Sequence, residues 1–148
     1  MGWQGRLAAA LVVVALVAGC GAAGPKILRA PVSGEGEWVV TDATGRLLSI
    51  ADDGGIPPDD GLGARNDVTA IDGRCDAVRL WLWQSPCPVE IRVGIANDGA
   101  GMTATVEEKA SCGNQSANLR ILKLVFDGPV DADAFTITDL GVIPEAGG

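Results

Sequence analysis

Beyond residue 36, apolar and polar residues alternate with a period of two along most of the chain. This alternation is typical of β-strands that bury one face, and the runs are separated by the Gly, Pro, Asp and Asn residues that favour turns. In the clearest run, residues 77–84, aliphatic residues alternate with Arg79, Trp81 and Trp83. The predicted strands cover residues 37–41, 46–51, 67–72, 77–84, 89–96, 102–108, 119–126 and, with less regular alternation, 130–138.

The same region shows no extended segment with the helical period of about 3.6 residues. A long loop at residues 52–66 is rich in Gly, Pro and Asp. The pattern predicts an all-β fold, a single antiparallel β-sandwich of seven or eight strands spanning residues 37–143. A tail follows at residues 144–148, and one further short strand is expected between residues 140 and 148.

One segment near the C-terminus has a more specific pattern. The strand end Leu124–Phe126 is followed by Asp127-Gly128-Pro129-Val130-Asp131 and then by Phe135-Thr136-Ile137. This order resembles a signature of bacterial Ig-like domains, in which a strand ending in Phe precedes Pro-Val-Asp and then Phe-x-Ile. The resemblance implies an Ig-like sandwich and no particular chemistry.

The N-terminal residues have the layout of an export signal. Arg6 precedes an apolar run of 12 residues from Leu7 to Ala18, and small residues follow that run. As a helix, the run would cover about 18 Å, which is well short of a hydrocarbon core of about 30 Å. A permanent membrane-spanning helix is therefore not favoured.

The segment Val17-Ala18-Gly19-Cys20 resembles the lipobox of bacterial lipoproteins, in which an aliphatic residue and two small residues precede an invariant cysteine. The resemblance implies that residues 1–19 are a signal peptide and that Cys20 carries a thioether-linked diacylglycerol. Two acyl chains anchor a protein stably, whereas one chain is marginal. The implied location is the extracytoplasmic face of the cell membrane. The alternative is an ordinary secretory signal in which the cysteine occurs by chance.

Residues 20–36 are rich in Gly, Ala and Pro without a period, and they predict a flexible tether behind the lipidated cysteine. Once Arg6 is removed with the signal, 10 basic residues face 19 acidic ones, a net charge of −9. This charge disfavours nucleic acid as a partner and repels anionic headgroups, so lipid must hold the domain at the membrane. The bias toward Ala, Gly, Val, Asp and Arg is typical of a high-GC bacterium such as an actinobacterium.

Three cysteines remain beyond the lipobox, an odd number for an oxidising compartment. A two-residue turn at Gly99-Ala100 predicts a hairpin whose register brings inward-facing residues together. Extending this register places Cys87 opposite Cys112, which predicts a structural disulfide and leaves Cys75 unpaired. A Cys75–Cys112 pair is the alternative, because the loop at 110–117 could leave the extrapolated ladder.

Arg79, Trp81 and Trp83 share one face of a predicted strand. Rows of aromatic residues stack on sugar rings in many carbohydrate-binding modules, and a wall glycan would lie near an anchored protein. The three residues are therefore candidate ligand-binding residues. The alternative is that the rings pack on the second face of a central strand or under the acidic loop.

Seven aspartates lie between residues 52 and 76, together with Arg65 and Arg74. Oxygen-rich loops bind Ca²⁺, but this spacing matches neither an EF-hand nor the glycine–aspartate repeat. Solvated turn aspartates explain the cluster equally well. We predict no metal site and no cofactor, and Ca²⁺ binding by this region remains the alternative.

Histidine and tyrosine are absent, so the commonest general base and the commonest metal ligand are not available. The sequence contains no GxSxG, phosphate-binding glycine loop or CxxC motif. It therefore predicts no catalytic residues and a non-enzymatic envelope lipoprotein that binds or scaffolds another envelope component, preferably a protein. The alternatives are a wall-glycan-binding module and a small hydrolase with two carboxylates in a cleft.

Overall fold

The computed structural model describes residues 24–32, 36–54, 66–112 and 118–144. The predicted signal peptide at residues 1–19, Cys20 and most of the predicted loop at 52–66 lie outside the described residues. The described residues form nine strands and one short 3₁₀ helix, η1 (Ala132–Ala134). The strands are β1 (Lys26–Pro31), β2 (Glu37–Asp42), β3 (Leu47–Asp52), β4 (Asp67–Ile71), β5 (Arg74–Gln84), β6 (Pro88–Asn97), β7 (Met102–Ala110), β8 (Asn118–Phe126) and β9 (Thr136–Pro144).

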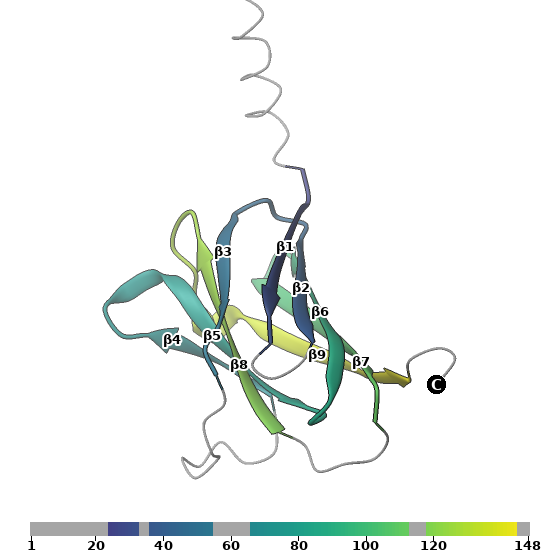
Figure 1. The fold of residues 1–148 in the computed structure, drawn as a ribbon. Coiled ribbons are helices and arrows are strands. Elements are labelled where there is room, and N and C mark those ends of the chain that lie inside the picture. The colour runs from purple at the N-terminus through teal and green to yellow at the C-terminus, as the bar shows by residue number, and fades with distance from the viewer. Residues whose placement is uncertain (1–23, 33–35, 55–65, 113–117, 145–148) are drawn as a thin grey trace, which may run out of the picture.

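The strands are arranged in two sheets that face each other (Figure 1). Sheet A contains five strands in the order β1-β2-β6-β7-β9, and sheet B contains four in the order β3-β8-β5-β4. The chain passes from one sheet to the other after β2, β5, β7 and β8. The predicted all-β sandwich is confirmed, and each strand predicted between residues 37 and 126 forms close to its predicted limits.

The predicted sandwich differs from the structure in the direction of two strand pairs. Eight strands, β2–β9, form where seven or eight antiparallel strands were predicted, but sheet A contains two parallel pairs, β2 with β6 and β7 with β9. Each parallel pair is joined by an excursion through sheet B, because parallel neighbours need a long connection. Alternation along the sequence reports which face of a strand is buried, but it does not report the direction of the neighbouring strand.

Part of the predicted tether is a strand, so the predicted start of the domain at residue 37 is wrong. β1 pairs with β2 in antiparallel register along its whole length. Leu28 and Ala30 pack against the core, whereas Ile27 is 64% exposed. The Gly and Pro residues around β1 make this short alternation hard to recognise in the sequence. The domain therefore begins no later than Lys26.

The last strand lies farther along the chain than predicted. Residues 130–135 form a corner that includes η1, and the extended segment runs from Thr136 to Pro144, into the predicted tail. Phe135, which is 6% exposed, fills the core at this corner. Asp131 caps η1 by accepting the N–H of Asp133 at 3.0 Å. The corner packs against the core through the ring of Phe135. The apolar residues of this segment therefore resemble a strand pattern in the sequence, although residues 130–135 do not form a strand.

The inner faces of the two sheets supply the core. Every second side chain of the central strands points inward, and burial of one such side chain contributes about 1.5–3 kcal/mol. Side chains that are at most 1% exposed include Trp38, Val40, Ile91, Val93, Ile95 and Val106 in sheet A and Leu80, Leu82, Leu122, Leu124 and Phe126 in sheet B. The outer positions of the same strands are therefore available for surface functions.

The hairpin between β6 and β7 has the predicted register, with Val93 opposite Val106 and Ile95 opposite Ala104. Gly99 has a φ of +91°, as the first central position of a type II′ turn requires. This tight turn fixes the alignment of the two longest neighbouring strands of sheet A, and with it the residues that meet at their other ends.

The predicted disulfide between Cys87 and Cys112 is confirmed, with a Cα–Cα distance of 5.9 Å. A bulge between Pro88 and Glu90 shifts the register by one residue, so that the N–H of Ser111 donates to the carbonyl of Cys87 at 3.1 Å. The disulfide forms despite this shift. Cys75 is free and exposed, which leaves no support for the alternative Cys75–Cys112 pair.

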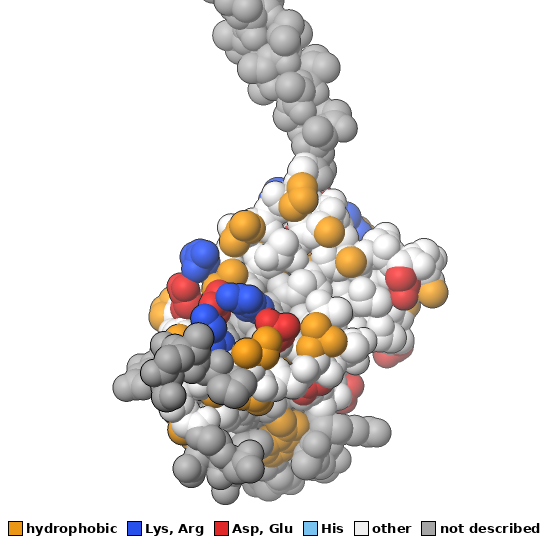
Figure 2. Space-filling model, turned by 90° about the vertical axis from the view of Figure 1, so that its right-hand side faces the viewer, with side chains coloured by type: hydrophobic (Ala, Val, Ile, Leu, Met, Phe, Trp, Pro, Cys, Tyr) orange, Lys and Arg blue, Asp and Glu red, His pale blue; other side chains and the backbone are white. Residues whose placement is uncertain are grey.

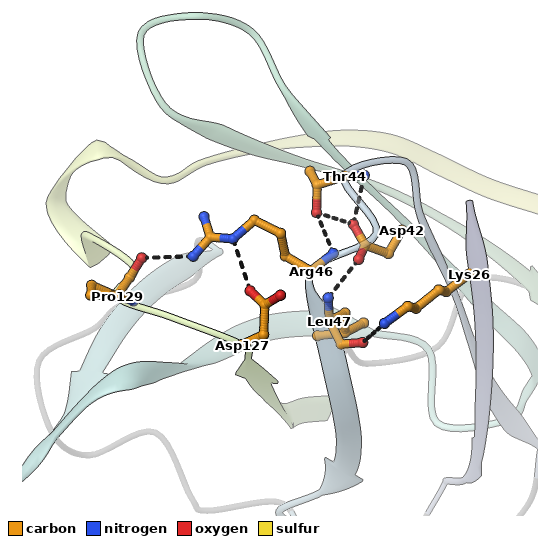
Figure 3. Close-up of polar contacts among 7 residues, drawn as sticks. All are labelled: Lys26, Asp42, Thr44, Arg46, Leu47, Asp127 and Pro129. Carbon is orange, nitrogen blue, oxygen red and sulfur yellow. Dashed lines mark hydrogen bonds and ion pairs between the residues drawn. The ribbon is translucent and has the colours of Figure 1, made fainter. Parts of the chain in front are cut away.

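The buried carboxylate of Asp42 closes the turn that carries the chain from sheet A to sheet B (Figure 3). It accepts the N–H and the hydroxyl of Thr44 at 2.9 and 2.6 Å, and the N–H of Leu47 at 2.7 Å. Arg46 extends from the same turn and binds Asp127 and the carbonyl of Pro129, each at 3.1 Å. These contacts join the turn to the corner between β8 and β9.

A second buried carboxylate, Glu108, binds the chain at another of the four crossings, the one after β5. It is 1% exposed and accepts the N–H of Ser85 at 2.8 Å, and it also binds the hydroxyl of Ser85. Ser85 begins the connection from β5 in sheet B to β6 in sheet A. Both core-facing carboxylates therefore hold main-chain donors at places where the chain changes sheet.

Replacement of Asp42 by Ala removes the acceptor for three donors at a buried turn. We expect a loss of about 3 kcal/mol in the free energy of unfolding, because donors buried without a partner are costly. Urea denaturation measures this loss. Asp98→Ala is the matched control, because the exposed Asp98 carboxylate also accepts N–H groups in a turn, and its loss should cost less than about 1 kcal/mol. Equal losses for both variants would contradict the role given to Asp42.

Candidate functional site

The predicted ligand-binding residues Arg79, Trp81 and Trp83 lie together on the outer face of sheet B. Their cross-strand neighbours on β8 include Ile121 opposite Trp81 and Leu119 opposite Trp83. Ile121 and Leu119 are only 1% and 6% exposed although they lie on an outer face. The two indole rings are themselves only partly exposed. The three residues therefore belong to a packed second layer of the sheet.

The polar groups of these residues are already engaged or enclosed. Arg79 Nε donates to Asp53 Oδ2 at 2.6 Å, and Trp81 Nε1 donates to Thr69 Oγ1 at 2.7 Å. Trp83 Nε1 is buried and has no hydrogen-bond partner within the described segments. A sugar would therefore find little free ring face or free polar group here. Sugar binding by this face stays a prediction, and the geometry agrees better with packing.

The acidic region does not form a metal cluster in the part of the chain that the structure describes. No group of three or more His, Cys, Asp or Glu side chains converges there. Asp76 pairs with Arg74 at 2.9 Å, and this hydrogen bond lowers the pKa of the Asp76 carboxyl. Asp59 and Asp60 lie outside the described residues.

A groove that the sequence reasoning missed lies on the outer face of sheet A, above Gly94. Its volume is about 430 Å³. Gly94 is an interior residue of β6, with β2 on one side and β7 on the other. It is not among the glycines with a positive φ, so its backbone conformation does not require glycine. A Cβ at this position would lie 2.8 Å from Thr105 Oγ1, so a side chain here would displace the Thr105 hydroxyl and project into the groove.

The walls of the groove come from four of the five strands of sheet A, namely β2, β6, β7 and β9. Thr41 and Thr105 flank Gly94 directly in the sheet register. Leu140 on β9 is 60% exposed and adds an apolar wall. The residues that line the groove are Val39, Thr41, Glu90, Arg92, Val93, Gly94, Thr105, Glu107 and Leu140.

One end of the groove is formed by an arginine held between two glutamates. Arg92 Nε lies 3.2 Å from Glu90 Oε1, and Arg92 Nη1 lies 3.7 Å from Glu107 Oε1. The hydrogen bond from Arg92 lowers the pKa of the Glu90 carboxyl. On the face of the molecule that Figure 2 shows, blue and red side chains lie side by side without a large patch of one sign.

The groove brings two carboxylates together, which is what the hydrolase alternative requires. General acid catalysis by a carboxyl group needs a raised pKa, so that the group is protonated near neutral pH. The pKa of Glu90 moves in the opposite direction because of Arg92. The arrangement therefore suits binding better than acid catalysis.

The groove could have been suspected from a glycine inside a strand pattern, since such a glycine often marks the close approach of a ligand or another backbone. The sequence could not show that Thr41, Thr105 and Leu140 surround it, because these residues come from three other strands. In the described segments, no helix is long and apolar enough to cross a membrane. Comparisons with protein-family profiles, curated proteins and solved structures give no match to this chain.

Replacement of Arg92 by Gln should raise the pKa of Glu90 toward its ordinary value, because the charged hydrogen-bond donor is lost. The measurement is an NMR titration of the Glu90 side-chain carboxyl. Arg74→Gln is the matched control, which should raise the pKa of Asp76 and leave that of Glu90 unchanged. An unchanged Glu90 titration in the Arg92 variant would show that the ion pair does not form in solution.

Proposed function

We propose that this chain is a membrane-anchored lipoprotein of the bacterial cell envelope and that its β-sandwich binds another envelope protein without catalysing a reaction. In this proposal, Cys20 carries the lipid and the groove above Gly94 receives a side chain of the partner. The groove lies on the exposed face of sheet A, where a partner surface can approach it.

The lipid anchor rests on the segment Val17-Ala18-Gly19-Cys20 and on the charge of the exported chain. A net charge of −9 gives the domain no attraction to anionic headgroups. The proposal therefore assigns membrane attachment to the acyl chains alone, and two such chains are sufficient for stable anchoring.

The observation that carries the binding role is the glycine at position 94. Glycine inside a strand lowers the stability of a protein by roughly 0.5–1 kcal/mol relative to alanine. The φ of Gly94 is not positive, so the backbone conformation does not explain why glycine occurs here. The presence of glycine is explained if a partner fills the hollow that the missing side chain leaves in the face of the sheet. The groove has apolar and polar walls and is as large as the smaller ligand pockets, which begin at about 300 Å³.

The charges at the rim restrict the partner. Among the residues that line the hollow, Glu90, Glu107 and Arg92 carry the charges, and these sum to −1. A partner side chain that is large and apolar, next to a basic residue, would fill the hollow and complement this charge. Large apolar anchors in pockets carry much of the energy of protein interfaces.

Replacement of Cys20 by Ser should release the protein from the membrane, because serine cannot form the thioether. Phase partitioning of the exported protein in a clouding detergent, together with mass spectrometry of the N-terminal peptide, measures this. The wild-type protein should enter the detergent phase with a diacylglycerol on Cys20, and the variant should stay in the aqueous phase. Wild-type protein in the aqueous phase without a fatty acid would overturn the anchor.

Replacement of Gly94 by Val should fill the groove and weaken partner binding. A photo-crosslinking amino acid at the exposed Thr41 would report contact with the partner in intact cells. A loss of about 1.4 kcal/mol in binding energy corresponds to about a tenfold loss of affinity, and the crosslink should fall accordingly. Ala96→Val is the matched control, since Ala96 lies two residues along the same strand face, and it should leave the crosslink intact. Equal crosslinking in both variants would contradict a role for the groove.

A further inference from the structure

We infer that the sandwich is held with one particular end against the lipid bilayer, an orientation that rests on the proposed anchor at Cys20. We call this end the anchor-side end. It consists of the start of β1, the turns after β2, β4 and β6, and the corner after β8. Its residues are Lys26, 43–46, 72–73, 98–101 and 127–131.

Contacts between these segments show that they form one end of the molecule. Ala43 N–H donates to the carbonyl of Ile95 at 2.8 Å, which joins the turn after β2 to the end of β6. Val130 N–H donates to the carbonyl of Cys75 at 2.8 Å, which joins the corner after β8 to the start of β5. The ammonium group of Lys26 donates to the carbonyl of Leu47 at 3.3 Å, so β1 begins beside the same turn (Figure 3).

The opposite end carries the connections after β5 and β7 and the disulfide between Cys87 and Cys112. In Figure 1, β1 starts at the top of the domain and runs away from that end toward the opposite one. β6 has 10 residues, so it spans about 33 Å between the two ends.

The length of chain behind the anchor decides which end faces the membrane. Six residue steps separate Cys20 from Lys26, and a fully extended chain of that length reaches about 21 Å at most. If the disulfide end rested on the headgroups instead, Lys26 would lie about 33 Å above them. The chain cannot reach that far. The predicted tether to residue 36 would have allowed both orientations, but β1 removes most of that length.

The charge of the anchor-side end indicates that it faces the bilayer without adhering to it. Two basic side chains, Lys26 and Arg46, face four acidic ones, so the end has a net charge of −2. The acidic residues are Asp72, Asp98, Asp127 and Asp131. Anionic headgroups repel such a surface. The short connection therefore excludes the inverted orientation, and the disulfide end is the part presented to the envelope.

Two positions on the chain, one at each end of the sandwich, can be labelled to measure this orientation. Cys75 is exposed and free at the anchor-side end, whereas the exposed Asn118 pairs with Gln84 at the opposite end of β5 and β8. The two positions are separated by about 30 Å along the strands. A donor fluorophore on Cys75, or on Asn118→Cys in a Cys75→Ser background, is measured against acceptor-labelled headgroups. The full lipidated protein is used in phosphatidylcholine vesicles.

We expect clearly greater energy transfer from position 75 than from position 118. Equal transfer, or greater transfer from position 118, in protein that floats with the vesicles would overturn the orientation alone. Protein that does not float would overturn the anchor, and this inference with it. Insertion of a flexible twelve-residue segment between Cys20 and Gly24 should reduce the difference. A difference that the insertion leaves unchanged would overturn the short connection as its cause.

Discussion

Burial of apolar side chains between two sheets is the constraint from which the rest of this structure follows. It places the large side chains of β2, β5, β6, β7 and β8 on the inside at every second position. It also forces the chain to change sheets at the ends of the sandwich. The two core-facing carboxylates, Asp42 and Glu108, stand at such crossings and hold main-chain donors there. Polar groups in the core thus stabilise the connections between the sheets.

The same constraint determined how much the sequence could predict. Alternation found the strands between residues 37 and 126, because one of their faces is buried. It could not find the parallel pairing of β2 with β6, because side chains alternate with a period of two in parallel and antiparallel strands alike. β1 was missed because only two of its side chains, Leu28 and Ala30, pack against the core. The disulfide was predicted from a hairpin register, although a bulge beside Cys87 alters that register.

The candidate site was harder to predict than the fold. Arg79, Trp81 and Trp83 do share one face, but the sequence could not show that Asp53 and Thr69 occupy their polar ends. The groove above Gly94 depends on strands that are distant in the sequence and adjacent in the sheet. An interior glycine is the one local sign of it. Its meaning depends on the backbone conformation and on the neighbouring Thr105, which the sequence does not give.

The start of the domain links the fold to the proposed function. If Cys20 carries a lipid, as we propose, a sandwich that began at residue 37 would move freely on a long tether, whereas one that begins at Lys26 would sit close to its anchor with a fixed end toward the membrane. The groove on sheet A then opens to the side, and the disulfide end points outward. In this proposal, a partner approaches the groove from the side of the anchored domain.

Hydrogen exchange at the main-chain amides of residues 26–30 tests this account most directly, measured by NMR on the folded protein. If β1 is paired with β2, alternate amides in this segment exchange slowly, in the pattern of an edge strand bonded on one side. If every amide between residues 26 and 30 exchanges at the rate of an unfolded peptide, β1 is a tether after all. The short connection to Cys20 and the fixed orientation would then be wrong.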